Sequence, residues 1–209
     1  MEILFSDAHI VVCVKQTGLV SQDAGDGSVP GQLRMILGSE EIYTVHRLDR
    51  EVGGVMVYAR TQKAAAALSR SVQENRLEKR YLAVLNGVSD APEATLEDLL
   101  YHDKQKNKTY VVKRSRKGVK DAKLEYTVLK TAEGLSLVRV RLHTGRTHQI
   151  RVQFASRGLP LYGDRKYGGS GDGGFGLWSF RLSFPHPVNG KRMEFEHLPP
   201  ETEPWKRFT

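Results

Sequence analysis

The sequence predicts an α+β protein, in which helices flank a mixed, mostly antiparallel β-sheet within a single domain. The chain has 209 residues, of which 39% are hydrophobic, and this is enough for one sizeable core. Only one long helical pattern interrupts the β-prone runs, and several strands follow one another in the second half. No repeat or low-complexity linker divides the chain. Consecutive strands with few helices are typical of the α+β class.

The first half of the chain contains two expected helices and several expected strands. Pro30 opens a short helical pattern that ends at Gly38. Thr61 is a candidate N-cap for a longer helix that continues to about residue 75. Apolar or alternating runs typical of strands cover residues 10–14, 42–45, 54–60 and 78–87.

The second half is expected to be mainly β. A turn near Glu133-Gly134 joins two alternating runs, the second of which suggests a bulge or burial on both faces. Thr147 is a candidate N-cap and Gly158 a candidate C′ residue for a short helix. The glycine-rich residues 161–176 lack Gly-Lys-Ser/Thr, so a flexible rim is expected there rather than a phosphate loop. Strand patterns cover residues 110–112, 124–130, 135–142, 177–184 and 193–195.

Charge favours a phosphate-bearing partner. The net charge is +8, with 32 Lys and Arg residues against 24 Asp and Glu. Residues 104–123 alone hold nine Lys or Arg, including Lys113 and Arg114, against the single acid Asp121. We expect a basic β-hairpin here that binds a phosphate backbone. A solvated hairpin that has no partner is the alternative interpretation.

Several classes of protein are disfavoured. Cys13 is the only cysteine and lies in an apolar run, so intrachain disulfides and Cys-based zinc sites are excluded. His143 and His148 lack the spacing of a helical metal pair, and we expect structural roles for them and no metal site. No cofactor motif is recognisable. The absence of a signal peptide and of a membrane-spanning run favours a cytoplasmic protein without membrane contact.

Two polar stretches are candidates for chemistry. In residues 46–54, Asp49 lies between Arg47 and Arg50 in a loop that precedes a strand, although a plain solvated loop fits these residues as well. In residues 143–158, the first turn of the expected helix carries His148, Gln149 and Arg151, so we expect an anion there.

Four motifs in the same order make the chain resemble the RluA-type pseudouridine synthases, from about Ile3 to Phe195. Each motif alone is weak evidence, whereas the four in this order are specific. They are His46-Arg47-Leu48-Asp49 with Gly53 and Gly54; Lys79-Arg80-Tyr81-Leu82-Ala83; Thr144-Gly145-Arg146-Thr147-His148-Gln149-Ile150-Arg151-Val152; and Gly158-Leu159-Pro160-Leu161-Tyr162-Gly163-Asp164 with Tyr167-Gly168.

The resemblance implies a role for each matching residue. Asp49 matches the catalytic aspartate, and Arg47 the arginine that enters the RNA where the target base is flipped out. Tyr81 matches the tyrosine that packs on the uracil, and Arg151 the arginine that pairs with the aspartate. Other expected substrate-binding residues are His46, Leu48, Arg146, His148, Gln149, Leu177, Lys113 and Arg114.

Some positions depart from the family's usual pattern. Val52-Gly53-Gly54 stands where Thr-Ser-Gly is usual, and Trp178-Ser179 where His-Ala is common. Val14-Lys15-Gln16-Thr17-Gly18 replaces a run that contains Asn-Lys-Pro. No preceding S4 RNA-binding domain is expected, because the resemblance begins almost at Met1.

The implied function is isomerisation of specific uridines in structured ribosomal or transfer RNA to pseudouridine, by a monomer that needs no cofactor. Two alternatives remain open at this point. One is an RNA-binding domain without turnover. The other is a nucleic-acid glycosidase that uses Asp49 to release a base and leaves abasic sites. The presence of Asp49, Tyr81 and Arg151 together favours the isomerase.

Overall fold

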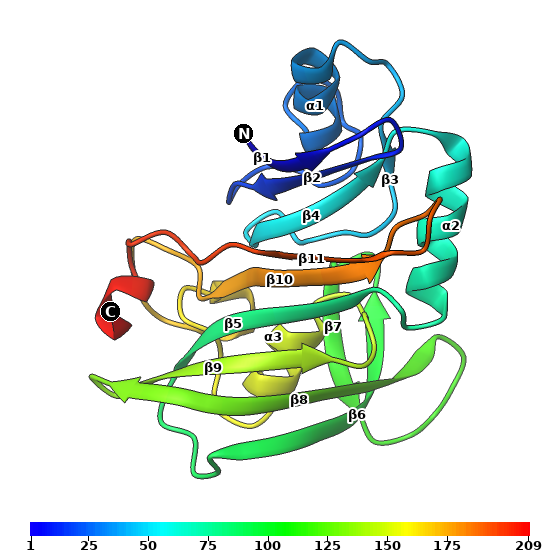
Figure 1. Cartoon of the computed structure of the whole chain (residues 1–209). Helices are drawn as coiled ribbons and strands as arrows, with labels where there is room; N and C mark the ends of the chain where they lie inside the picture. Colours follow the sequence, from blue (N-terminus) through cyan, green and yellow to red (C-terminus); the bar gives the residue numbers. More distant parts are fainter. The chain divides into compact units, whose positions relative to one another are not determined.

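Two units make up the chain in the computed structural model, which describes residues 1–209. Unit 1 comprises Met1–Lys79 and Trp178–Pro199, and unit 2 comprises Arg80–Leu177 and Pro200–Thr209. The boundary falls within two strands, since β5 (Glu78–Asn86) begins in unit 1 and β10 (Leu177–Pro185) begins in unit 2. Figure 1 identifies the elements of both units.

Unit 1 is a small mixed sheet with two helices. Its strands follow the order β1-β2-β4-β10-β11. The short strand β3 lies outside this order and pairs with the C-terminal end of β4. Only β10 and β4 run parallel to each other; the other pairs are antiparallel. The elements not yet delimited are β1 (Glu2–Ser6), β2 (Ile10–Lys15), α1 (Val29–Leu37), β3 (Tyr43–Thr44), β4 (Gly53–Ala59), α2 (Gln62–Gln73) and β11 (Arg192–Glu196).

Local signals set the ends of both helices in unit 1. The Ser28 side chain accepts a hydrogen bond from the Gly31 amide, and α1 ends where Gly38 adopts a left-handed conformation with φ of 58°. The Thr61 side chain caps α2 by accepting from the Ala64 amide. Leu68 on α2 is fully buried and joins the core formed by β2, β4 and β10. The helix boundaries expected from the sequence are therefore confirmed to within two residues.

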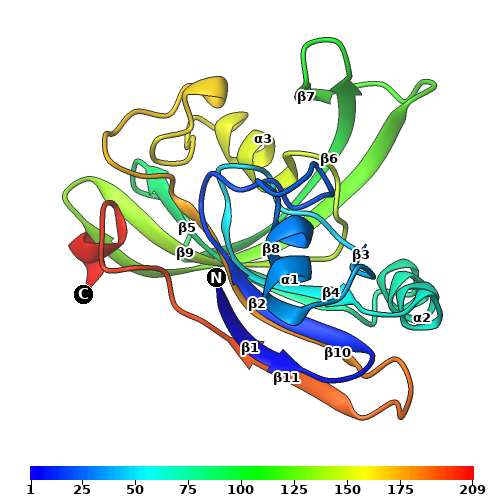
Figure 2. The same cartoon turned by 90° about the horizontal axis from the view of Figure 1, so that it is seen from above.

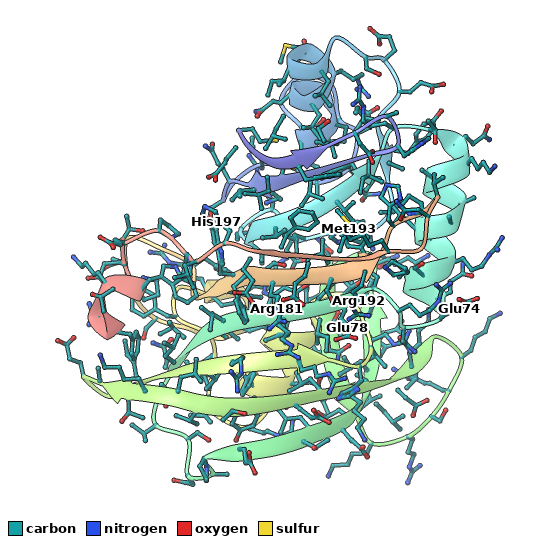
Figure 3. The ribbon with its side chains drawn as sticks, in the orientation of Figure 1. Glu74, Glu78, Arg181, Arg192, Met193 and His197 are labelled. Atoms are coloured by element: carbon teal, nitrogen blue, oxygen red, sulfur yellow. The ribbon has the colours of Figure 1, made fainter.

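The β10–β11 hairpin carries charged side chains on an exposed face, shown in Figure 3. Arg181 lies 2.5 Å from Glu194 on the opposite strand, and Arg192 lies 2.7 Å from Glu78 of β5. Exposed ion pairs of this kind each contribute about 0–1 kcal/mol. The hairpin is therefore held mainly by its backbone ladder and by apolar residues on the core-facing side.

Unit 2 is an antiparallel sheet covered on one face by a short helix. Its strands follow the order β5-β9-β8-β6-β7. The helix α3 (Gln149–Ala155) packs on it through Val152, which contacts Leu100 and Ala122. The remaining elements are β6 (Glu93–Asp103), β7 (Lys108–Val112), β8 (Val119–Ala132), β9 (Leu135–Leu142) and the 3-10 turns η1 (Arg165–Tyr167) and η2 (Trp205–Phe208).

The predicted fold class is confirmed, with two corrections of detail. Thr147 is not the N-cap of α3: His148 occupies that position in a left-handed conformation with φ of 54°, and no side chain caps the helix. The bulge expected in β9 lies instead in its partner β8, between Val128 and Lys130, while the alternative of burial on both faces holds at the start of β9, where Leu135 and Ser136 are both buried. None of the helices is both long and apolar enough to cross a membrane.

Candidate active site

The loop that carries Asp49 joins β3 to β4 in unit 1 and is tied down at several points. The Val52 amide donates to the Asp49 carbonyl at 3.0 Å, and this bond closes a turn that begins at Asp49. Arg50 is held to Gly18 twice, since its carbonyl accepts from the Gly18 amide at 2.8 Å and its Nε donates to the Gly18 carbonyl at 2.9 Å. The Asp49 side chain is half-buried at the start of this turn.

Lys15, at the end of β2, is the central brace of the loop. Its side chain is fully buried, and its Nζ donates to the carbonyls of Gln16 at 3.2 Å, Arg50 at 3.1 Å and Val52 at 2.6 Å. An ammonium has three N–H donors, and all three are used here. Burial lowers the pKa of Lys15 to about 8, and the carboxylates of Glu51 and Asp49 oppose that shift. One buried cation thus connects the segment that follows Asp49 to the end of β2.

We expect Lys15→Met to remove a pH dependence of stability. Below about pH 8 the ammonium is charged in both the native and the unfolded chain, so the cost of burying it is present in full. Between about 8 and the unfolded value of 10.5 the native protein loses the proton first, so the free energy of unfolding rises with pH. The free energy of unfolding that Lys15 adds between these two pH values is roughly 3 kcal/mol at most.

Urea unfolding of both proteins at neutral pH and near pH 10 measures this difference. Burial also lowers the pKa of Lys79 to about 8, but that residue is present in both proteins and its contribution cancels in the comparison. Wild-type stability should rise relative to the variant as the pH increases. Parallel changes in the two proteins would contradict the assignment of the titrating amine to Lys15.

Residues 46–48 alternate between the interior and the surface. His46 is buried, and its Nε2 accepts from the Val57 amide at 3.2 Å. Burial, reinforced by the positive charge of Lys79, holds the pKa of His46 well below its usual value, so the ring is neutral. Leu48 is also buried, and Ser21 bonds both its amide and its carbonyl. His46 and Leu48 therefore shape the loop within unit 1; their contact with substrate stays a prediction.

Arg47 is exposed between these two buried residues. Its Nη1 donates to the Gln22 side chain at 3.1 Å. No acid of unit 1 forms an ion pair with Arg47. A guanidinium held only by a neutral amide can exchange that contact for a phosphate or a base edge at little cost. Arg47 lies two residues before Asp49 in the same loop, and its entry into the RNA stays a prediction.

The two glycines after the loop lie against β10. In the parallel β4–β10 register, Gly53 pairs with Trp178 and Gly54 with Ser179. A Cβ on Gly53 would lie 2.2 Å from the Trp178 ring, and one on Gly54 would lie 2.2 Å from the Ser179 carbonyl oxygen. Trp178 is buried and donates from Nε1 to the His197 carbonyl at 2.8 Å (His197 is labelled in Figure 3). The two departures from the family pattern are thus in direct contact.

In unit 2, Arg151 of α3 is enclosed by an acid and two aromatic rings. Its Nε and Nη2 donate to the two carboxylate oxygens of Asp164 at 2.7 and 2.8 Å, and both side chains are buried. The guanidinium carbon lies 5.2 Å from the ring centres of Tyr167 and of Phe175. Fork-to-fork pairing and stacking fix the guanidinium plane. The expected pairing of Arg151 with Asp49 joins different units and stays a prediction.

The residues before Arg151 hold the start of α3 in place. The Gln149 side chain accepts from the Thr144 hydroxyl at 2.7 Å and from the Arg146 amide at 3.0 Å, and it donates to the Lys123 carbonyl at 3.1 Å. His148 Nδ1 lies 2.9 Å from the Tyr167 hydroxyl. Both side chains are buried. Their predicted contact with substrate remains untested, while their structural role in unit 2 is clear.

The other predicted residues of unit 2 fall into two groups. Tyr81 on β5 and Leu177 are buried, and Tyr81 shares its sheet face with its cross-strand partner Val140. Lys113 and Arg114 are exposed in the loop that follows β7. Sequence reasoning gave no role to Asp164, although the motif that contains it was recognised. Its sequence neighbours, Gly163 on one side and Arg165 and Lys166 on the other, gave no sign of a buried acid.

Comparison with solved structures identifies the fold. The structure of human RNA pseudouridylate synthase domain containing 1 matches with a TM-score of 0.81 at 23% identity, covering 95% of this chain and 83% of that one. Human RNA pseudouridylate synthase domain containing 4 matches with a TM-score of 0.79, also at 23% identity, over 95% and 88% of the two chains. The fold is therefore that of pseudouridylate synthase catalytic domains.

Sequence relatives define the family. The family model for RNA pseudouridylate synthase matches residues 9–156. An RNA pseudouridine synthase of Aquifex aeolicus is 36% identical, covering 97% of this chain and 70% of the relative. The ribosomal large subunit pseudouridine synthase D of Zymomonas mobilis is 30% identical over 96% and 70%. The chain belongs to the RNA pseudouridylate synthase family, in its RluA-type branch, and is an RNA pseudouridine synthase, an isomerase.

Proposed function

We propose that this enzyme isomerises specific uridines of structured ribosomal or transfer RNA and that Asp49 is its essential group. The observation that carries the proposal is that Asp49 begins a turn whose Arg50 and Val52 carbonyls accept hydrogen bonds from the buried ammonium of Lys15. A catalytic side chain must be held close to the reacting atom, and this requires a fixed backbone at its position. Ribosomal RNA is the substrate class named for relatives such as the Zymomonas mobilis protein.

The reaction breaks the N1–C1′ glycosidic bond, turns the uracil and joins C5 to C1′. Substrate and product are isomers, so the reaction needs no oxidant, reductant or energy source. The carboxylate of Asp49 attacks the sugar or the base, or assists departure of the base, and each of these roles needs it ionised and close. Arg151 beside it would stabilise the ionised form. The C5 proton must also leave, and Tyr81 is the group proposed to move it.

The target base must leave the RNA helix to react, which costs a few kcal/mol. In this proposal Arg47 fills the vacated space, and Tyr81 with Leu177 receives the uracil. The exposed Lys113 and Arg114 contact the phosphate backbone, together with Arg146. We further propose that residues 1–209 act as one catalytic domain, as a cytoplasmic monomer without a cofactor.

Pseudouridine mapping across cellular RNA, with and without the gene, tests this function. At least one uridine in a ribosomal or transfer RNA should lose its modification in the deletion strain, and the purified protein should restore it on the corresponding transcript. An unchanged map would favour an RNA-binding protein without turnover. Strand scission at the target after treatment with the protein would instead indicate abasic sites and a glycosidase.

A further inference from the structure

Two tyrosines face each other across the β6–β7 hairpin of unit 2. Tyr101 and Tyr110 are direct cross-strand partners, so their side chains lie on the same face. Tyr110 is 36% exposed and is the only aromatic residue among the exposed large hydrophobic side chains, the others being aliphatic. Figure 2 shows this hairpin and the start of β8 extending away from the rest of the unit 2 sheet.

The core of unit 2 does not need this ring. The neighbouring residues Leu100 and Val111 are also cross-strand partners, and they pack with Val152 of α3. Because successive side chains of a strand point to opposite faces, Tyr110 points away from α3 and from that cluster. β7 is also the last strand in the order of this sheet and pairs only with β6. An exposed aromatic ring on an edge strand is available to a partner.

The surroundings of the pair are cationic. The Arg116 guanidinium lies 4.9 Å from the centre of the Tyr101 ring, and Lys108 Nζ lies 5.8 Å from that of Tyr110. Both distances are within the range of cation–π contacts. Lys113 and Arg114 follow β7 directly and are exposed. Aromatic rings interleaved with cations bind single-stranded nucleic acids, because the rings stack on bases while the cations contact the phosphates between them.

We propose that Tyr110 is a stacking platform for an unpaired base of the RNA, at a contact separate from the uridine that reacts. Tyr101, which contacts Arg116, lies on the same face of the adjacent strand, and Lys108 contacts a neighbouring phosphate. A base inside a duplex presents no free face, so the contact selects single-stranded segments or loops. The proposal rests on the proposed function only in taking the polymer to be RNA.

The test measures equilibrium binding of the full-length protein to a fluorescent oligouridine of about 16 nucleotides and to an RNA duplex of similar length. Tyr110→Ala and Tyr110→Leu should weaken oligouridine binding by about 5- to 100-fold and leave duplex binding unchanged. Tyr110→Phe keeps the ring and should bind like wild type. Leu129→Ala removes an apolar side chain of β8 in the same unit that is 45% exposed, more than Tyr110, and serves as the matched control.

Salt dependence separates stacking from charge. Tyr110→Ala should keep the wild-type slope of log affinity against log salt, whereas Lys113→Gln combined with Arg114→Gln should flatten it for both RNAs. Wild-type oligouridine affinity in Tyr110→Ala, or equal losses for oligouridine and duplex, would overturn the proposal. Because pseudouridine formation is not the readout, failure of this proposal and failure of the catalytic role of Asp49 are distinguishable.

Discussion

Asp49→Asn is expected to lower the single-turnover rate of pseudouridine formation by at least about a thousand-fold, while RNA affinity changes little. Asparagine keeps the size of the side chain but removes the charge and the nucleophilic oxygen pair. The turn itself should survive, because the bond within it runs from the Val52 amide to the Asp49 backbone carbonyl. The measurement is product formed on the RNA identified by mapping, with enzyme in excess over substrate.

Glu51→Gln is the matched control for this prediction. It removes one negative charge from the same loop, two residues from Asp49, at an exposed position. If the loss in Asp49→Asn came from the local charge balance around Lys15, Glu51→Gln would reproduce it, because both acids act on the Lys15 amine. A rate near wild type for Glu51→Gln, together with an inactive Asp49→Asn, isolates the chemical role. A rate near wild type for Asp49→Asn would disprove the proposed mechanism.

The elements around this loop were predictable because their signals are local. Pro30, Gly38 and Thr61 lie within one turn of the helix ends that they indicate, and β2 and β4 are continuous apolar runs. β6 was not predicted, because its local signal is weak. Along Glu93–Asp103 only Leu96 and Leu100 are buried, so the period-two alternation is too incomplete to indicate a strand.

Sequence patterns did not predict contacts between residues that are far apart in the chain. Asp164 and Arg151 are 13 residues apart with a helix end and a turn between them, so their pairing depends on how that segment folds back. The left-handed His148 was missed because Thr147 is the better N-cap by residue type. The His148 ring lies within hydrogen-bond distance of the Tyr167 hydroxyl, and the adjacent Gln149 side chain accepts from the Thr144 hydroxyl. Tertiary contacts outweighed local preference at the start of α3.

The need for glycine at position 53 also depends on a distant residue, Trp178. Trp178 belongs to a strand 125 positions later and lies beside Gly53 in parallel register. Gly53 is not in the left-handed region, so glycine is not needed there for backbone conformation. It is needed because a Cβ would lie 2.2 Å from the indole ring. The family pattern has Ser and His at these two positions. We infer that the small residue and the large ring compensate each other, and that either exchange alone leaves a clash or a cavity.

A double-mutant cycle tests this compensation and should give a large effect. Gly53→Ser alone should destabilise the protein by at least about 2 kcal/mol through overpacking. Trp178→His alone should cost about 2–3 kcal/mol, because a smaller ring leaves a void at a buried site. The double variant should lose less than the sum of the two, with a coupling energy of about 1–3 kcal/mol. Urea unfolding of the four proteins measures the cycle.

Gly54 supplies the control for that cycle, because its obstacle is backbone rather than side chain. Its φ is +125°, and a Cβ there would lie 2.2 Å from the Ser179 carbonyl oxygen. No exchange at Trp178 can relieve that contact, so Gly54→Ser and Trp178→His should show no compensating coupling. Additive losses at Gly53 as well would mean that the loss caused by Gly53→Ser does not come from contact with the Trp178 ring. The exchange of Ser for Gly beside the Asp49 loop would then need a cause other than the shape of Trp178.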